Sequence, residues 1–531
     1  MHNPPRIALV VIPFFVFAGV WLIYRRGFGG RITGWTESVR EMAIASLSWL
    51  YIGVGALSIL AVVLAAVTIG SVRIGGRDAP ARVTPAEAVA VGFAASTSVG
   101  LLFWAAGEPL FHAHNPPFGL TPLTREAQIM ARSAAYLHWG VLSHMTFGLF
   151  MVAFAVATGT LKGRRSVESV IAGARRGRRA AWGDLLDGIV FVFAILALIS
   201  ALASATVSIT AQGLALSGTG LRGGLLTGVL VTLVFTAVIL GARPLGTSLA
   251  ALSRVSLGLV LVFLLLVLIL GPKGFIFGGG FRALSTMLSN FPALMFGGFL
   301  DDPRGWAGRW TITHLGGWML LAPLVGYVLS RAARGYTLAD AVRYLVFAPM
   351  LLSLLCILIL GGLTLAMDQR TGGQIWAALP RLGTDSALLL ALNELWMPRT
   401  MRVLLLILSA LFFVTFAGAM FHAILHIVVP GDDADRRVIL ERRAVMVIGL
   451  LAFGFAAWCL LHQGGMGVVA AVSRLGAIPG LFITLGAVLT VFRFCMTAPR
   501  HLHPPRPPEP DDVGVHVATG AKVRIEDRRK T

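Results

Sequence analysis

Charged residues are scarce in this chain. Only 13% of its 531 residues are charged, whereas 56% are hydrophobic, and the mean hydropathy is +0.82. Such values exclude an ordinary soluble protein and indicate a chain that crosses a membrane several times. Acidic residues are the scarcer sign, with 24 against 44 basic residues and a net charge of +20. Because the basic residues lie mainly in connecting loops and the tail, we interpret them as orientation signals and expect no nucleic-acid partner.

Cysteine is also rare, which excludes a disulfide framework. Cys356, Cys459 and Cys495 lie far apart in apolar stretches, without the close spacing of a metal site. His422 and His426 are four residues apart and share a helix face, but the pattern supplies no third ligand. No nucleophile, base and orienting residue occur at a recognisable spacing. We therefore predict no enzyme, no metal and no cofactor.

Long apolar runs are what the chain has in abundance. A helix needs about 20 apolar residues to cross a bilayer, and a scan for such runs predicts an all-α membrane protein with twelve transmembrane helices. The first run, after Arg6, could be a signal peptide, but no small-residue cleavage site follows it, so we expect an uncleaved helix. The predicted helices are 7–24, 46–70, 88–111, 133–160, 185–213, 224–242, 251–271, 308–332, 341–366, 402–428, 442–461 and 471–495.

An even number of spans places both termini on one side of the membrane. The most basic loop, with seven Lys or Arg residues within 162–179, follows the fourth predicted helix and shares that side. By the positive-inside rule, both termini face the cytoplasm of a bacterial-type inner membrane. Residues 273–305 are predicted to form an outer connector with an amphipathic interfacial helix near 283–298. Residues 497–531 are predicted to be a disordered tail that could touch anionic lipid.

The predicted helix 88–111 is interrupted at mid-depth. Ser96, Thr97 and Ser98 carry hydroxyls there and, with Gly100, weaken the helical ladder, so that backbone groups can turn towards a solute. A tight contact between helices through small residues is the alternative. Glu108 lies in the same span and needs a partner or water, because a charge inside a membrane is costly and tends to be functional.

Two other predicted helices carry tryptophans that can enclose a cation. Trp139 and Phe147 lie about two turns apart on one face of 133–160, and Trp318 lies in 308–332. If these helices meet, Trp139 and Trp318 can attract a positive charge to their ring faces. Either could instead be an interfacial anchor or a packing residue. In 402–428, the Thr415 hydroxyl could bind a cation or bond to its own helix.

Taken together, these motifs resemble the betaine/choline/carnitine transporter family in order from about residue 7 to 496. The matching residues are Gly100-Leu-Leu-Phe-Trp104, Glu108-Pro109 with His112, His138-Trp139-Gly140, Leu252-Ser253, Leu270-Gly271-Pro272, Trp310-Thr311-Ile312, Trp318, Pro323, Gly326, Arg334-Gly335, Phe412-Phe413-Val414-Thr415 and Ala477-Ile478-Pro479.

The resemblance implies a LeuT-like fold. Two peripheral helices (1–86) would precede two five-helix repeats of inverted topology, helices 3 to 7 in 87–272 and helices 8 to 12 in 306–496. The broken first helix of each repeat would flank a solute site near the bilayer midplane. The resemblance also implies alternating access and a homotrimer.

This chain departs from the family at the expected solute site. The family has a Gly-Met-Gly-Ile-Gly run at residues 96–100, so here Ser96, Thr97 and Ser98 would line the unwound segment. The family has Trp at His144 and Tyr at Phe147, which would adjust selectivity, although His144 could simply pack between helices. Three family tryptophans fall on Gly317, Trp318 and Leu321. Trp139 and Trp318 would thus be what remains of the aromatic cage.

The ion site differs as well. Sodium-driven members of the family have a Thr-Ser pair where this chain has Thr415 and Phe416. A hard cation requires oxygen ligands, and Phe416 offers none. We therefore expect coupling to protons, exchange or an altered sodium site. The overall prediction is a secondary transporter of a small quaternary-ammonium or related zwitterionic solute. A membrane solute sensor that keeps the fold but does not transport is the alternative.

Overall fold

The computed structural model describes residues 7–160, 167–172, 183–217, 248–297, 305–384, 386–431 and 435–497. Within these ranges the chain is helical, and one isolated β-bridge joins Arg73 to Thr337. Nine helices there are long and apolar enough to cross a membrane, or ten if the bent helix Pro85–His114 counts as one span. The predicted all-α, multi-span fold is confirmed. The predicted helix 224–242, the basic residues of the 162–179 loop and residues 498–531 lie outside the described residues.

The first two predicted helices form one long element with a break. Helix α1 (Ala8–Ile23) leads through a π-helical turn, η1 (Tyr24–Phe28), into α2 (Gly29–Thr68). Gly27 adopts a φ of 85° at the break, a conformation that glycine reaches without strain. Helix α2 begins at Gly29 and not at residue 46. Its first half is helical but contains charged residues, so the scan for apolar runs did not include it. Within that half, Glu37 and Arg40 form an ion pair one turn apart.

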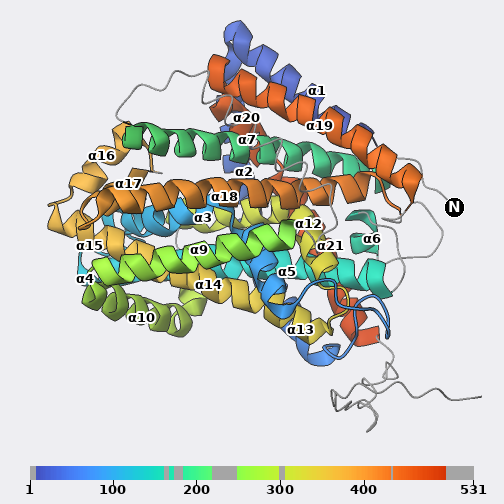
Figure 1. The fold of residues 1–531 in the computed structure, drawn as a ribbon, viewed down its shortest axis with the longest axis horizontal. Coiled ribbons are helices and arrows are strands. Elements are labelled where there is room, and N and C mark those ends of the chain that lie inside the picture. Colours follow the sequence, from blue (N-terminus) through green and yellow to red (C-terminus); the bar gives the residue numbers. More distant parts are fainter. Residues whose placement is uncertain are drawn as a thin grey trace, which may run out of the picture.

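Helix α3 (Pro85–His114) lies at the centre of the bundle. The Thr84 side chain caps its start, and Glu87 completes a capping box with bonds of 3.4 and 2.8 Å. Helices that lie beside α3 include α9 (Ser248–Leu270) and α18 (Pro398–Val428). In Figure 1, α9 and α18 run along the long axis with α7 (Gly183–Ser217), while α1 and α19 (Arg436–Gln463) cross together on one side.

The chain between 125 and 160 forms one span with two π-helical segments. They are η2 (Tyr136–Leu142), between α4 (Arg125–Ala135) and α5 (Ser143–Phe154), and η3 (Ala155–Thr160). Helix α5 packs against α12 (Thr313–Ala332), which continues from η5 (Gly308–Ile312). The next span consists of α13 (Leu338–Val342), η6 (Arg343–Phe347), α14 (Ala348–Cys356), η7 (Ile357–Gly361) and α15 (Gly362–Arg370).

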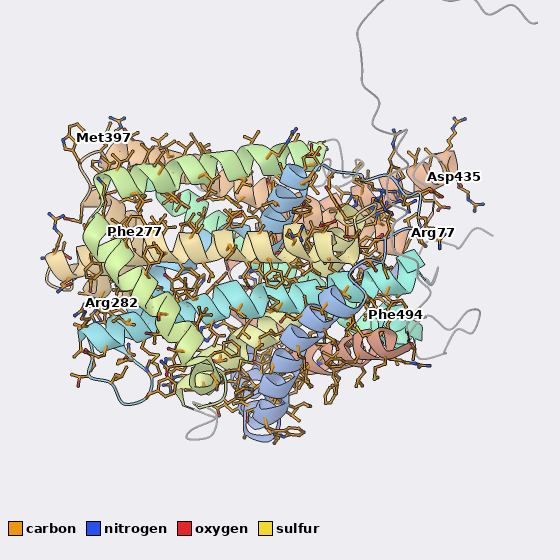
Figure 2. All side chains as sticks on the ribbon, turned by 90° about the horizontal axis from the view of Figure 1, so that it is seen from below. Arg77, Phe277, Arg282, Met397, Asp435 and Phe494 are labelled. Carbon is orange, nitrogen blue, oxygen red and sulfur yellow. The ribbon has the colours of Figure 1, made fainter. Side chains whose placement is uncertain are left out.

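The predicted connector contains a helix, α10 (Lys273–Ser289), which starts earlier than residue 283 and is followed by η4 (Ala293–Gly297). Its start is fixed by Arg132 of α4. The guanidinium lies 3.4 Å from the carbonyl oxygens of Phe275 and Ile276 and 5.1 Å from the centre of the Phe275 ring. Figure 2 shows α10 running obliquely across its neighbours, with Phe277 and Arg282 along it.

Short helices close the two ends of the bundle. Helices α16 (Gln374–Leu382) and α17 (Ser386–Asn393) lie at the same end as α10 in Figure 1, and α6 (Val167–Ala172) lies at the other end. The scan for long apolar runs did not predict α16 or α17, because each is too short to cross a bilayer. Helices α20 (Met466–Arg474) and α21 (Ala477–Thr497) complete the fold.

Residues 70–74 and 335–339 form a backbone clamp between the loops that follow α2 and α12. Four hydrogen bonds of 2.9 Å join Gly335, Ile74, Leu338 and Ala339 to carbonyl oxygens of the opposite segment. Gly335 has a φ of +88°, and a Cβ there would lie 2.3 Å from the Ala81 nitrogen. Only glycine fits this close approach.

Candidate functional site

Helix α3 is bent where the sequence predicted an interruption. The segments Pro85–Ser96 and Gly100–His114 meet at 61°. The Ser96 hydroxyl is buried at the bend and has no hydrogen-bond partner among the described residues. The side chains of Thr97 and Ser98 lie outside that description. The bend therefore places an unpaired polar atom deep in the bundle, where a buried hydroxyl normally has a partner.

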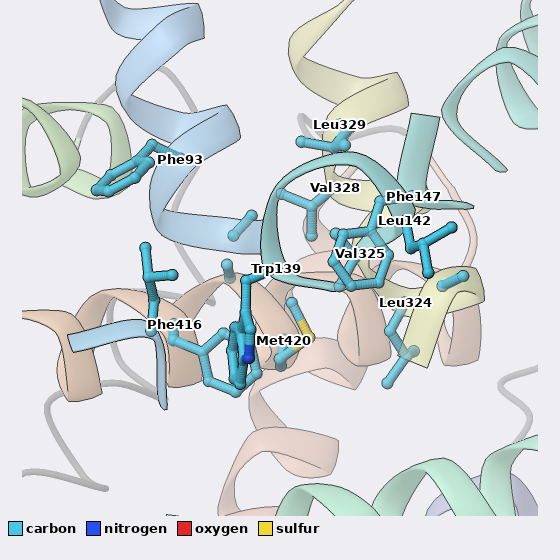
Figure 3. Packing of buried hydrophobic residues seen from close by; sticks show 14 of the residues in the cluster. Phe93, Trp139, Leu142, Phe147, Leu324, Val325, Val328, Leu329, Phe416 and Met420 are labelled. Atoms are coloured by element: carbon cyan, nitrogen blue, oxygen red, sulfur yellow. The ribbon is translucent and has the colours of Figure 1, made fainter. Parts of the chain in front are cut away.

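A pocket of about 210 Å³ opens beside this bend. Trp139 of η2 forms part of its wall, and Figure 3 shows this ring beside Phe416 and Met420 of α18. All lining residues are uncharged, and most are aromatic or small. They are Gly100, Phe103, Trp104, Trp139, Ala201, Leu202, Ser204, Ala205, Ser208, Phe413 and Phe416. Such a surface suits a small solute with an apolar cationic group.

Trp139 is held on three sides. Its ring stacks on Trp104 with centroids 6.4 Å apart and meets the edge of Trp318 at 4.9 Å. Its indole N–H donates to Glu108 Oε2 at 2.7 Å. The neighbouring His138 reaches the other oxygen of the same carboxylate through Nδ1 at 2.5 Å. The π-helical turn η2 allows two consecutive side chains to reach one carboxylate, and such turns are frequent at functional sites.

Glu108 is fully buried and receives four contacts, two at each oxygen. His112 Nε2 lies 3.1 Å from Oε1, the oxygen that also contacts His138. His314 Nε2 of α12 lies 3.2 Å from Oε2, the oxygen that accepts from Trp139. These contacts offset the cost of burying a carboxylate. We call Glu108 with His112, His138 and His314 the Glu108 cluster.

The sequence predicted that Glu108 needs a partner but did not name it. A signal for His314 exists, because it lies four residues after Trp310 and four before Trp318, near one face of α12. Three helices must be placed in space before His112, His138 and His314 can be seen to converge on Glu108.

The three closest members, Glu108, His112 and His138, offer atoms within 4.8 Å of one another. Zinc bonds to histidine nitrogen and carboxylate oxygen of about 2.0–2.2 Å would place two tetrahedral ligands about 3.3 Å apart. His138 Nδ1 and Glu108 Oε1 are only 2.5 Å apart, which is a hydrogen-bond distance. His426 Nδ1 contacts the His422 carbonyl oxygen at 2.8 Å, within its own helix. The Glu108 cluster and the His422–His426 pair are thus held by hydrogen bonds.

The other residues of the predicted aromatic cage do not share the pocket. Trp318 lies behind Trp139 and donates its indole N–H to the His138 carbonyl at 3.0 Å. Phe147 is buried against Trp318, with centroids 5.8 Å apart, and lies beside Leu142 and Val325 in Figure 3. His144 Nδ1 lies 2.9 Å from the Gly140 carbonyl oxygen. Its Nε2 lies 3.4 Å from the Ser353 hydroxyl, so His144 joins two packed helices.

Gly317 and Leu321 line a second pocket, of about 170 Å³. Its walls come from α2, α7, α12, α20 and α21, and it includes Arg40 and Tyr51. The predicted site residues are thus divided between two pockets and the packing between helices.

The predicted ion position is occupied by an aromatic ring and an engaged hydroxyl. The Thr415 hydroxyl donates to the Leu411 carbonyl at 2.6 Å and lies 3.3 Å from the Ser256 hydroxyl. Phe416, the next residue, lines the first pocket. Neither residue presents a free oxygen towards the pocket.

A bundle of apolar spans, a bent helix and an aromatic pocket at the bend are together typical of multi-span membrane transporters. A sequence model of the BCCT, betaine/carnitine/choline family transporter, matches residues 7–500, and the chain belongs to this family. It is therefore a transporter and not an enzyme, and the predicted family is confirmed.

Individual relatives are distant. Glycine betaine transporter 2 of Vibrio parahaemolyticus is 28% identical over 42% of this chain, an alignment that spans only 40% of that protein. A probable glycine betaine transporter of Desulfitobacterium hafniense is 26% identical over 65% of this chain and 69% of its own length. An uncharacterized transporter of Mycobacterium bovis is 26% identical over 77% of this chain and 68% of its own length.

Proposed function

We propose that this protein is a secondary active transporter of a small quaternary-ammonium or related zwitterionic solute. It works by alternating access, with two inverted five-helix repeats in a LeuT-like arrangement. The pocket at the bend of α3 carries this proposal, because Trp104, Trp139 and Phe416 present aromatic rings to a space of about 210 Å³. The names of the relatives as glycine betaine transporters support the solute class.

The electrostatics of the pocket also support a cationic group. Aromatic faces attract a quaternary ammonium without requiring it to form hydrogen bonds. Behind Trp139, the Glu108 carboxylate accepts the indole N–H at 2.7 Å. It is a buried acidic group one side chain away from the pocket. In a medium of low dielectric constant, such a group acts strongly on a cation nearby.

The residues at the family's usual sodium position support a transport cycle that does not use sodium there. The Thr415 hydroxyl is already bonded to Leu411 and close to Ser256. The Phe416 side chain has no oxygen with which to complete a sodium shell. We expect solute binding to be equal in sodium and potassium salts.

Counterflow in proteoliposomes tests the function. Vesicles loaded with unlabelled choline or glycine betaine should take up the labelled compound, and Trp139→Leu should abolish this uptake. Trp376→Leu is the matched control, because Trp376 stacks on His114 at 4.4 Å and lines neither pocket described above. Saturable binding without counterflow would favour the non-transporting sensor. Failure to bind any quaternary ammonium would refute the solute class.

A further inference from the structure

The histidines of the Glu108 cluster differ in which ring nitrogen carries a proton. The fixed donors and acceptors around each ring determine this position. The Trp306 indole N–H can only donate, and it lies 3.3 Å from His112 Nδ1. His112 Nδ1 is therefore an acceptor, and a neutral His112 carries its proton on Nε2, where it donates to Glu108. His138 Nε2 lies 2.9 Å from the Thr311 hydroxyl, which can donate. A neutral His138 then donates to Glu108 through Nδ1.

His314 differs from the other two histidines. Its Nδ1 lies 2.9 Å from the Trp310 carbonyl oxygen, which can only accept, so Nδ1 must carry a proton. If His314 is neutral, Nε2 presents a lone pair to Glu108 Oε2 at 3.2 Å. Two acceptors facing each other repel. The geometry therefore requires one further proton between these two atoms, either on His314 or on the carboxylate.

Of the four residues in the Glu108 cluster, His314 is the one through which a proton can enter or leave. The His314 side chain is 14% exposed, whereas those of Glu108, His112 and His138 are fully buried. Among the described residues, the titratable groups that face the carboxylate are His112 from α3, His138 from η2 and His314 from α12. The first two need no charge to complete their hydrogen bonds, so titration centres on the Glu108–His314 pair.

The pair is linked to the solute pocket through Trp139, which forms part of the pocket wall. Glu108 Oε2 accepts from both partners, His314 on one side and Trp139 on the other. The His314 ring lies 5.8 Å from the Trp139 ring and 6.0 Å from the Trp318 ring. With its proton the pair is neutral, and without it the pair carries one negative charge beside the pocket. A buried negative charge requires a compensating cation.

We propose that the Glu108–His314 pair is a proton site at which the proton competes with the cationic group of the solute, so that transport proceeds as proton/solute exchange. This inference rests on the proposed function above. The buried carboxylate needs one compensating positive charge. In the solute-free state the proton supplies this charge, and in the solute-bound state the cationic group of the solute supplies it. One proton leaves for each solute cation that binds, and charge is conserved.

Binding measured against pH tests the exchange. Choline is the probe, because its charge does not change with pH. For the intact protein in detergent, the choline Kd should fall about tenfold for each unit by which the pH rises, over the pH range in which the pair is protonated. One proton per choline should be released into a weakly buffered solution. In proteoliposomes, an acidic interior should drive choline accumulation.

His314→Gln isolates the pair. The glutamine amide N–H can still donate to Glu108, but it does not titrate. The amide N–H supplies the donor that a neutral His314 lacks, so Glu108 no longer needs the extra proton. Over the pH range in which the natural protein shows its slope, the variant should bind choline with the high-pH affinity and release no proton. His114→Gln is the matched control. His114 is on the same helix as Glu108 and pairs with a different carboxylate, Asp368, at 2.9 Å, so the pH slope should be retained.

The outcomes separate the two proposals. Saturable choline binding with a pH-independent Kd would overturn the exchange and leave the proposed function standing. Accumulation driven by an alkaline interior would also overturn it, because that result means that proton and solute move together. If neither choline nor glycine betaine bound at any pH, the proposed function would fail, and the exchange with it.

Discussion

Trp139 and Trp318 have different positions, although the sequence assigns both to one cage. Trp139 forms part of the pocket wall and is anchored by a carboxylate, whereas Trp318 packs behind it and donates to a backbone carbonyl. A hydrogen bond to a charged group contributes about 1.5–3 kcal/mol, and one between neutral groups about 0.5–1.5 kcal/mol. The two rings should therefore respond differently to substitution.

We expect Trp139→Phe to raise the solute Kd by about tenfold or more, because about 1.4 kcal/mol corresponds to a factor of ten. Trp318→Phe should change the Kd by about threefold or less and mainly lower the melting temperature. Calorimetric titration and thermal unfolding in detergent distinguish these effects. Equal losses of affinity in both variants would mean that Trp318 also contacts the solute.

Ser96 allows a second test at the scale of one atom. Its hydroxyl is buried at the bend without a described partner, so Ser96→Ala removes no described hydrogen bond. We expect no loss of thermal stability but about fivefold weaker solute binding, which corresponds to one hydrogen bond of about 1 kcal/mol. Ser58→Ala is the control, because the Ser58 hydroxyl bonds to the Val54 carbonyl at 2.7 Å. The control should be less stable, with unchanged affinity.

At the scale of elements, the clamp between 70–74 and 335–339 depends on one glycine. Gly335→Ala combines a φ of +88° with a Cβ 2.3 Å from the Ala81 nitrogen. Gly76→Ala has a φ of +108° but meets nothing within 4 Å. Each variant carries a conformational cost of about 1–2 kcal/mol, and only Gly335→Ala adds the collision with the backbone.

We therefore expect Gly335→Ala to lower the melting temperature and the yield of folded protein clearly more than Gly76→Ala. Thermal unfolding and size-exclusion profiles of the two variants, side by side, measure this difference. Similar profiles would show that the clamp can open to accept a methyl group.

The sequence predicted those elements that have a strong periodic or apolar signal. The apolar runs at 251–271 and 402–428 correspond closely to α9 and α18. The charged first half of α2 and the short helices α16 and α17 were missed, because their helicity comes from ion pairs and packing and not from long apolar runs. The interruption at residues 96–100 was predictable, because hydroxylated residues beside a glycine weaken a helix locally.

The candidate site was only partly predictable for a related reason. Glu108 can be identified from the sequence alone, because a carboxylate in an apolar span requires a partner for its charge. Its partners do not stand out, since each histidine alone resembles a packing residue. The separation of Trp139 from Gly317 and Leu321 follows from the rotation of α12 against its neighbours, and composition carries no information on that rotation.

At the scale of the whole molecule, the two ends of the bundle differ. Figure 2 places Met397 at one end and Arg77 and Asp435 at the other. Trp396, which is 84% exposed, lies beside Met397, as expected of an aromatic anchor at a membrane interface. The predicted orientation puts Arg77 and Asp435 in the cytoplasm, on the same side as both termini.

Single cysteines test this orientation. In a Cys495→Ser background, where Cys356 and Cys459 remain buried, Asp435→Cys should react with an impermeant maleimide only in inside-out vesicles. Glu394→Cys, near Met397, should react only in right-side-out vesicles. The opposite labelling pattern would reverse the orientation of the chain in the membrane.

The clamp also anchors the start of α3, whereas the rest of that helix lies beyond the bend. It ties the end of α2 to the end of α12, and the Tyr336 hydroxyl extends the tie by donating to the Val83 carbonyl at 2.7 Å, just before α3 begins. The first part of α3 (Pro85–Ser96) is thus anchored to the ends of α2 and α12. The second part (Gly100–His114) carries Trp104 and Glu108 beyond the bend. Rotation about the bend would move Trp104 and Glu108 together, and it would separate the buried carboxylate from Trp139 and His314, which lie on other elements.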